Sequence, residues 1–230
     1  MGLGSSICKR SVFCQSQGTV GIYRNIELVS TPSAVISFVV PQIFLTKDQN
    51  WDVQVAAYLQ CKEGTEGEVT ATLETGVAAS GLLHCHRDGE ERVDLRFTVP
   101  GDSVKRWFPV GYGEHPVYKL TVAFEGSEKT VSVGFRTADL IREKIGDDEE
   151  SMFFRVNDID VFARGSNFIP MDVFESRISD EDIAVLLDAA VKGNQNVIRV
   201  WGGGLYQRDS FYDIADRLGL LVTLTSWREG

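Results

Sequence analysis

The sequence contains few histidines and cysteines, the residues that usually hold zinc, with three histidines and four cysteines in 230 residues. It has no C-x-x-C pair, and the spacing of these residues matches no zinc-ligand series. Cys85 lies between His84 and His86, which we interpret as a polar strand or turn. We therefore expect no metal and no cofactor. The disulfide state stays open, because three pairings or free thiols are possible for Cys8, Cys14, Cys61 and Cys85.

Positive charge is also scarce in this sequence. Lys and Arg number 23 against 33 Asp and Glu, which gives a formal net charge of −10. This balance opposes the attraction to phosphate that dominates nucleic-acid affinity, so no nucleic-acid partner is expected. The acidity is sufficiently explained as a means of keeping the protein soluble.

Long apolar runs are missing as well. No stretch approaches the roughly 20 apolar residues that a membrane-spanning helix needs. Lys9 and Arg10 precede a segment, Ser11 to Gly18, that is too short and too polar for the core of a signal peptide. The sequence predicts no membrane span and shows no targeting signal.

The composition itself is that of a globular protein, with 43% hydrophobic and 24% charged residues. From about Gly21 to Phe135, short β-rich segments alternate with turn residues, as is typical of a β-sandwich. Val53, Val55 and Ala57 show the two-residue period that turns one face inward. The predicted strands are Gly21 to Ser30, Ala34 to Phe44, Asp52 to Gln60, Glu68 to Glu74, Arg92 to Val99, Tyr118 to Glu125 and Lys129 to Arg136.

The pattern changes after Asp139. An acidic stretch, Gly146 to Glu150, predicts a solvated loop, and we place a domain boundary near it. Phe162 to Asn167 then indicates a strand and its end. Ser179 and Asp182 form the S-x-x-D start of a helix.

Helical spacing continues this second region. The buried stripe of the first helix is predicted to be Ile183, Leu186, Leu187, Ala190 and Val191. A strand over Asn196 to Trp201 follows, then a helix near Asp209 to Leu218 that ends at Gly219, then a strand over Leu220 to Thr225. Phe211, Ile214, Ala215 and Leu218 are expected on one face of the second helix. The order β-α-β-α-β favours parallel strands, and three strands cannot close a barrel of eight.

Two segments follow the predicted parallel strands, where the active sites of such barrels lie. They are Gly165 to Asp172 and Arg199 to Gly204. The guanidinium of Arg199 can support an anionic carboxylate, and the ring of Trp201 can stack on a sugar. A structural salt bridge and a packed indole are the alternatives that spacing leaves open. The glycines of the second segment match no nucleotide-binding motif.

At these residues the chain resembles the β-mannosidases of glycoside hydrolase family 2. The resemblance rests on Phe162-Ala-Arg-Gly-Ser-Asn167-Phe-Ile-Pro170 and Asn196-Val-Ile-Arg199-Val-Trp201-Gly-Gly-Gly204, followed by Tyr206, Phe211-Tyr212 and Asp216-Arg-Leu-Gly219. Upstream, Trp107-Phe-Pro109-Val-Gly111-Tyr-Gly113, Tyr118 and Phe135-Arg-Thr137 are similar to the family's Ig-like domain, and Gly18-Thr-Val-Gly21-Ile-Tyr-Arg24 to the end of its sugar-binding-fold domain.

The resemblance implies a multidomain fold, β plus α/β. Residues 1–30 would be the remnant of an N-terminal galactose-binding-like β-sandwich, residues 31–140 an Ig-like β-sandwich, and residues 141–230 the first part of an incomplete (β/α)₈ TIM barrel. It also implies a retaining glycosidase that releases terminal β-D-mannose from oligosaccharides or glycoproteins. A lysosomal or secreted location would follow from the family's usual one in eukaryotes.

The resemblance assigns substrate contacts but no catalytic residue. Arg199 and Trp201 match positions that line the family's mannose subsite, and Asn167 matches a position in the first strand-end loop. The family's acid/base and nucleophile glutamates lie on later barrel strands, so those roles are not given to Glu175, Glu181 or Glu229. We expect little or no turnover by this chain, whose partner would be a mannose-containing oligosaccharide.

Two other classes remain open. The β-rich region can be a noncatalytic module that binds carbohydrate or protein. An unrelated α/β enzyme is less well supported, because the sequence shows no catalytic triad, phosphate loop or metal constellation.

Overall fold

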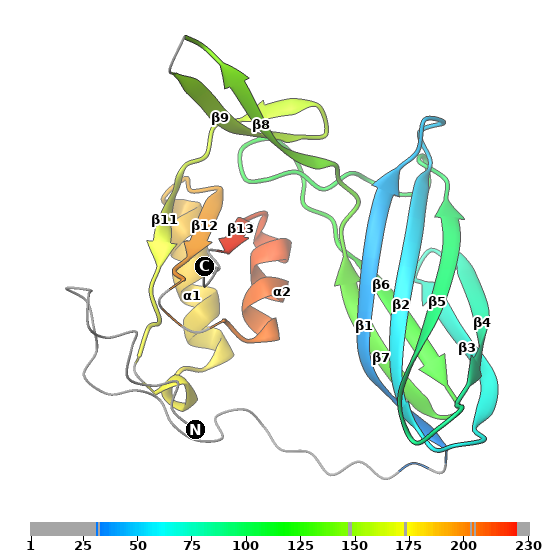
Figure 1. Ribbon diagram of the computed structural model, residues 1–230. Coiled ribbons are helices and arrows are strands. Elements are labelled where there is room, and N and C mark those ends of the chain that lie inside the picture. The colour runs from blue at the N-terminus through cyan, green and yellow to red at the C-terminus, as the bar shows by residue number, and fades with distance from the viewer. Residues whose placement is uncertain are drawn as a thin grey trace.

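The computed structural model describes residues 31, 33–146, 149–172, 174–202, 204 and 206–224. The predicted strand over Gly21 to Ser30, the cysteines Cys8 and Cys14, and Glu229 lie outside the described residues. Figure 1 shows three parts: two packed sheets in blue to green, a small sheet around β8 and β9, and a helix-covered sheet in yellow to red.

The first sheet contains three antiparallel strands, β1 (Ala34–Leu45), β2 (Trp51–Cys61) and β5 (Gly89–Val99), in the order β1-β2-β5. Val53, Val55 and Ala57 of β2 are buried, whereas the residues between them are partly exposed. The predicted two-residue period is therefore confirmed in this strand.

The second sheet has four antiparallel strands in the order β4-β3-β6-β7. They are β3 (Glu66–Leu73), β4 (Ala78–His84), β6 (Tyr118–Phe124) and β7 (Ser127–Val133). Inward residues of both sheets form one buried cluster that includes Trp51, Leu59, Leu120 and Phe135. We call residues 34–135 the two-sheet unit. Strand β4 was not predicted from the sequence.

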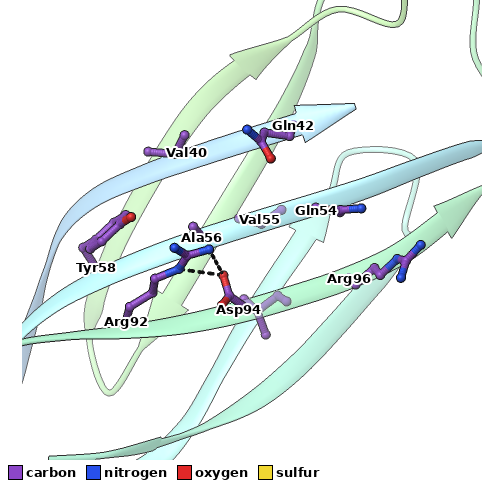
Figure 2. Close-up of a pocket in the computed structure, with 10 residues that line it drawn as sticks. Val40, Gln42, Gln54, Val55, Ala56, Tyr58, Arg92, Asp94 and Arg96 are labelled. Atoms are coloured by element: carbon purple, nitrogen blue, oxygen red, sulfur yellow. Dashed lines mark hydrogen bonds and ion pairs between the residues drawn. The ribbon is translucent and has the colours of Figure 1, made fainter. Parts of the chain in front are cut away.

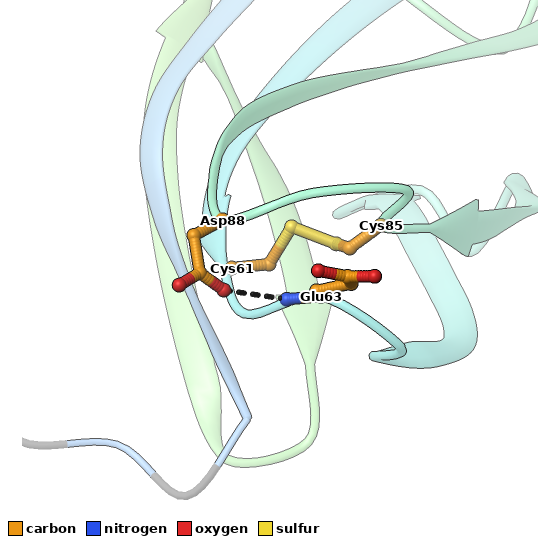
Figure 3. The surroundings of a disulfide bond; sticks show 4 residues. All are labelled: Cys61, Glu63, Cys85 and Asp88. Carbon is orange, nitrogen blue, oxygen red and sulfur yellow. Dashed lines mark hydrogen bonds between the residues drawn. A yellow bond between two sulfur atoms is a disulfide. The ribbon is translucent and has the colours of Figure 1, made fainter.

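A disulfide between Cys61 and Cys85 links the two sheets (Figure 3). Cys61 is the last residue of β2, and Cys85 directly follows β4; their Cα atoms are 6.4 Å apart. Beside the bridge, the amide of Glu63 donates to a carboxylate oxygen of Asp88 at 2.8 Å. The residue between the two histidines is thus a structural half-cystine, in line with its interpretation as part of a strand or turn.

A third antiparallel sheet, not predicted from the sequence, follows the two-sheet unit. It contains β8 (Ala138–Lys144), β9 (Glu150–Val156) and β10 (Ile159–Val161) in the order β10-β9-β8. Of the described residues of the acidic stretch, Gly146 and Glu149 lie between β8 and β9, and Glu150 begins β9. The amide of Ile145 donates to the carbonyl of Glu149 at 2.9 Å. The boundary placed between residues 140 and 141 falls inside β8.

The last part has the predicted β-α-β-α-β order. Its elements are β11 (Gly165–Phe168), the 3₁₀ turn η2 (Glu175–Arg177), α1 (Asp180–Lys192), β12 (Val197–Val200), α2 (Asp209–Leu218) and β13 (Leu221–Leu224). The three strands are parallel, in the order β11-β12-β13. We call residues 165–224 the parallel unit. No described helix is long and apolar enough to cross a bilayer.

Local signals explain where the two helices begin and end. The Ser179 hydroxyl accepts from the Asp182 amide at 3.1 Å, and the Asp182 carboxylate accepts from the Ser179 amide at 2.9 Å, which completes the predicted capping box. Helix α2 ends at Gly219, whose φ of 75° lies in the left-handed region. The predicted helix signals are confirmed.

The helices cover one face of the parallel sheet. Phe168, Ile198 and Val200 share a buried cluster with residues of both helices. The four residues predicted for the inner face of α2 contribute to this cluster. One prediction for α1 is wrong: Leu186 is 40% exposed, whereas Ala184 packs partly against the cluster. The helix presents a face turned slightly from the one that apolar spacing indicated.

Trp107 joins the three parts in a third buried cluster. It lies between β5 and β6, is fully buried, and packs with Val156, Val161, Val197 and Leu221. Its indole Nε1 donates to the carbonyl of Asp216 at 2.8 Å. A residue from a loop of the two-sheet unit is therefore buried against residues of the parallel unit.

An ion pair lies beside this cluster. Arg136 and Asp216 approach to 3.7 Å, and the Arg136 guanidinium is 4.2 Å from the centre of the Trp107 ring. Burial raises the pKa of the Asp216 carboxyl and lowers the pKa of the Arg136 guanidinium. The Arg136 and Asp216 side chains are 31% and 39% exposed, so the ion pair is only partly shielded from water.

Candidate functional site

The candidate site lies on the face of the parallel sheet opposite the helices. The register pairs Asn167 of β11 with Arg199 of β12, and Arg199 with Thr223 of β13. Side chains of register partners point to the same face, and Ile198 and Val200, which flank Arg199, face the helices. The three residues therefore form a polar row, which we call the strand-end row.

Two of the three predicted substrate-binding residues are in direct contact. The Arg199 Nη1 atom donates to the Asn167 side-chain oxygen at 2.8 Å, and both side chains are exposed. Within the described residues, Arg199 has an amide as its partner rather than a carboxylate. Its guanidinium carries five N–H donors, so this bond leaves several for a ligand.

Trp201, the third predicted residue, follows β12 directly. Its amide donates to the Phe168 carbonyl at 3.0 Å, and its carbonyl accepts from the Gly204 amide at 3.1 Å. These bonds hold the backbone of Trp201 at the ends of β11 and β12. The residue is partly buried, and no described side chain stacks on its indole. No described contact links the Trp201 side chain with Asn167 or Arg199.

Arg208, which sequence reasoning missed, ties together the loops after β11 and β12. Its Nη2 atom donates to the carbonyls of Glu175 and Ile178, each at 2.9 Å, and its Nη1 atom donates to Asp180 at 3.2 Å. The Ser210 hydroxyl donates to the same Asp180 oxygen at 2.8 Å. No sequence signal identifies such a residue, because its partners lie about thirty positions away.

Glu175 belongs to this loop network and not to the strand-end row. One of its carboxylate oxygens lies 3.7 Å from Arg208 Nε, and the other is buried without a hydrogen-bond partner in the described structure. The row itself, Asn167, Arg199 and Thr223, contains no carboxylate. Retaining glycosidases use two carboxyl groups about 5–5.5 Å apart. The row is therefore suited to binding a polar ligand.

Comparison with known proteins extends this description. No family model matches the chain. The β-mannosidase of Rattus norvegicus is 40% identical over 141 residues, which cover 58% of this chain and 16% of that protein. This chain is a homologue of β-mannosidases. The β-mannosidase of Mus musculus is 30% identical over 213 residues, 88% of this chain and 24% of that protein.

A solved structure shows the same relationship. The β-D-mannosidase of Dictyoglomus thermophilum matches with a TM-score of 0.73 and 29% identity, over 84% of this chain and 24% of that chain. The largely β-stranded fold of this β-mannosidase homologue is thus that of part of a solved glycosidase. The chain spans about a fifth of the length of its curated relatives, 16% of the rat protein and 24% of the mouse protein.

Proposed function

We propose that this β-mannosidase homologue serves in the release of terminal, non-reducing β-D-mannose from oligosaccharides or glycoproteins. The observation that carries the proposal is the similarity to the mouse β-mannosidase over 88% of the chain. Such a length includes both the two-sheet unit and most of the parallel unit. The reaction would be that of a retaining O-glycosidase.

We propose a finer division of the fold on the same basis. Residues 31–140 would be an Ig-like β-sandwich, supported by two packed antiparallel sheets with one core. Residues 141–230 would be the first part of an incomplete (β/α)₈ TIM barrel, supported by three parallel strands with helices on one face. Residues 1–30 would be the remnant of a galactose-binding-like domain.

Asn167, Arg199 and Trp201 are the substrate-binding residues of this proposal. The open face of the sheet would be the inner face of a barrel, and the strand-end row lies toward the carboxyl ends of the strands, where barrel enzymes bind substrate. Arg199 and Asn167 offer hydrogen-bond donors to sugar hydroxyls, and Trp201 offers a ring face. The proposed ligand is a mannose unit of an oligosaccharide.

Catalysis by the 230 residues alone is proposed to be weak or absent. The family's two catalytic glutamates lie on later strands of its barrel. Within the described residues, Glu175 faces Arg208 and Glu181 is exposed at the start of α1, so neither joins the strand-end row. A mannoside should be bound here without being hydrolysed at a measurable rate.

Titration of the chain with mannose, followed by tryptophan fluorescence, tests this proposal. Saturable quenching by mannose is expected, and Arg199→Ala should weaken the affinity about tenfold, or about 1.4 kcal/mol. Trp201→Phe should remove most of the signal, because the other described tryptophans, Trp51 and Trp107, are buried. Arg142→Ala is the control, since Arg142 is an exposed arginine on β8.

The outcomes separate binding from catalysis. No saturable response to mannose, or equal affinities of wild type and Arg199→Ala, would contradict the proposed subsite. Release of p-nitrophenol from p-nitrophenyl β-D-mannoside, if lost in Glu175→Gln, would contradict the expected absence of turnover.

The location is proposed to be lysosomal or secreted. The Cys61–Cys85 disulfide supports it, because disulfides persist mainly in oxidising compartments. The alternative function, a noncatalytic module that binds carbohydrate or protein, is favoured by one specific observation: a hollow on the outer face of the first sheet.

A further inference from the structure

The outer face of the β1-β2-β5 sheet is hollowed (Figure 2). The hollow has a volume of about 350 Å³, which is within the range of small-ligand sites. It lies on the two-sheet unit, apart from the strand-end row. Its lining residues are Val40, Gln42, Gln54, Val55, Ala56, Tyr58, Arg92, Asp94, Leu95 and Arg96.

A small residue between longer ones creates the hollow. In the middle of the face, Ala56 pairs in register with Val40 on β1 and Asp94 on β5. The next outward row on one side contains Tyr58 and Arg92, and the row on the other side contains Gln42, Gln54 and Arg96. Ala56 thus forms a low floor, and longer side chains rise at both ends.

The charges around the floor are paired with one another. The Arg92 Nε atom donates to Asp94 at 2.8 Å, and Arg96 donates to both oxygens of Asp52 at 2.6 and 2.8 Å. Both pairs couple a positive with a negative side chain, which leaves little net charge to attract an ion. The paired groups keep N–H donors and oxygen lone pairs that face solvent.

The two ends of the hollow offer different contacts. Tyr58 provides an aromatic ring at one end, with the Arg92 guanidinium 5.8 Å from the ring centre. Gln42 and Gln54 provide side-chain amides at the other end; Gln54 also donates to Asp52 at 2.8 Å, and Gln42 has no side-chain partner in the described structure. A ring next to uncharged amides and paired charges suits a ligand with one apolar face and a rim of hydroxyl groups.

We propose that this hollow is a second saccharide-binding site, which holds one pyranose unit of a neutral oligosaccharide. The apolar face of the pyranose ring stacks on Tyr58 above the floor at Ala56. Its hydroxyl groups bond to Gln42, Gln54 and the Arg92–Asp94 pair. The site goes beyond the proposed mannoside subsite and does not depend on it, because no residue is shared.

Calorimetric titration with β-1,4-mannotriose tests the proposal, carried out in an Arg199→Ala background in which binding at the strand-end row is expected to be about tenfold weaker. Saturable binding is expected. Tyr58→Ala should weaken it about tenfold because the stacking surface is lost, and Ala56→Leu should do the same because the floor is filled. Phe162→Ala is the matched control, since Phe162 is an aromatic residue 76% exposed outside this face.

Two further readouts make the result decisive. Thermal unfolding identifies a variant that has lost its fold, and shifts in the side-chain amide signals of Gln42 and Gln54 on adding mannotriose report binding in the folded protein directly. Absence of saturable heat at millimolar mannotriose overturns the proposal. So does equal affinity of Tyr58→Ala, Ala56→Leu and the Arg199→Ala parent, because binding would then lie elsewhere.

Discussion

The two-sheet unit and the parallel unit bury their apolar residues in different ways. In the first, two sheets close on one core and a disulfide bridges them. In the second, helices cover one face of the sheet, and part of the other face is covered by Trp107 from the two-sheet unit. The buried core of the two-sheet unit is therefore formed by its own residues, whereas part of the core of the parallel unit is supplied by Trp107. Substitutions can test that difference.

The largest effect is expected from Trp107→Ala. This change empties a fully buried site and removes the bond to Asp216, so it should cost about 3–5 kcal/mol. The loss should open the parallel unit, while the two-sheet unit stays folded. Hydrogen exchange resolved by peptide should show lost protection in β12, α2 and β13.

Trp107→Phe is the control for this substitution, because it keeps most of the packing and removes only the indole donor. Its effect should be smaller than that of Trp107→Ala. Undiminished protection of α2 in Trp107→Ala would show that the stability of the parallel unit does not depend on the packing of Trp107.

The converse experiment removes the disulfide. The double change Cys61→Ala and Cys85→Ala opens a loop of sequence separation 24 and should cost the two-sheet unit about 3 kcal/mol. Chemical denaturation monitored by circular dichroism, with hydrogen exchange in parallel, measures this loss. Exchange in α1 and α2 should not change. Loss of protection there would mean that the two units unfold as one.

The smallest effect concerns only the start of α1. Ser179→Ala removes the capping acceptor and should cost about 1 kcal/mol, seen as faster amide exchange in the first turn. Ser179→Thr retains the acceptor and is the control. An equal effect of both variants would show that the hydroxyl does not stabilise the helix.

The stabilisation of α1 by its capping box should also depend on pH. Hydrogen bonds from the Ser179 side chain and backbone lower the pKa of Asp182 below 3.8. A carboxyl with a lowered pKa stabilises the folded state above its ordinary value, and this stabilisation is lost as the pH falls through the lowered pKa. The difference in amide-exchange rate of the first turn of α1 between wild type and Ser179→Ala should therefore become smaller in acid.

Sequence periodicity predicted the elements whose residues alternate clearly between buried and exposed positions. Strand β4 was missed because its only buried residue is Leu83, and Leu82 beside it is 70% exposed. The β8-β9-β10 sheet was missed because β8 has no buried residue and the other two strands contribute only Val156 and Val161. Such strands are determined by their neighbours more than by their own pattern.

The candidate site shows the same limit. Chain order placed Arg199 and Asn167 at the ends of neighbouring parallel strands, but their hydrogen bond depends on the register, which periodicity does not reveal. Leu186 was misplaced because the packing of two helices on one sheet decides which side of α1 is covered. The bridging role of Arg208 arises from loop geometry alone.

Gly219 lies at a contact between the parallel unit and the two-sheet unit. A Cβ atom built there would lie 2.5 Å from the His115 ring, and the Gly219 carbonyl accepts from the Val110 amide at 2.9 Å. The residue that ends α2 therefore also packs against the two-sheet unit. A side chain at position 219 would strain the backbone at the end of α2 and would collide with His115 of the two-sheet unit. Glycine at position 219 therefore lets His115 of the two-sheet unit lie directly against the end of α2.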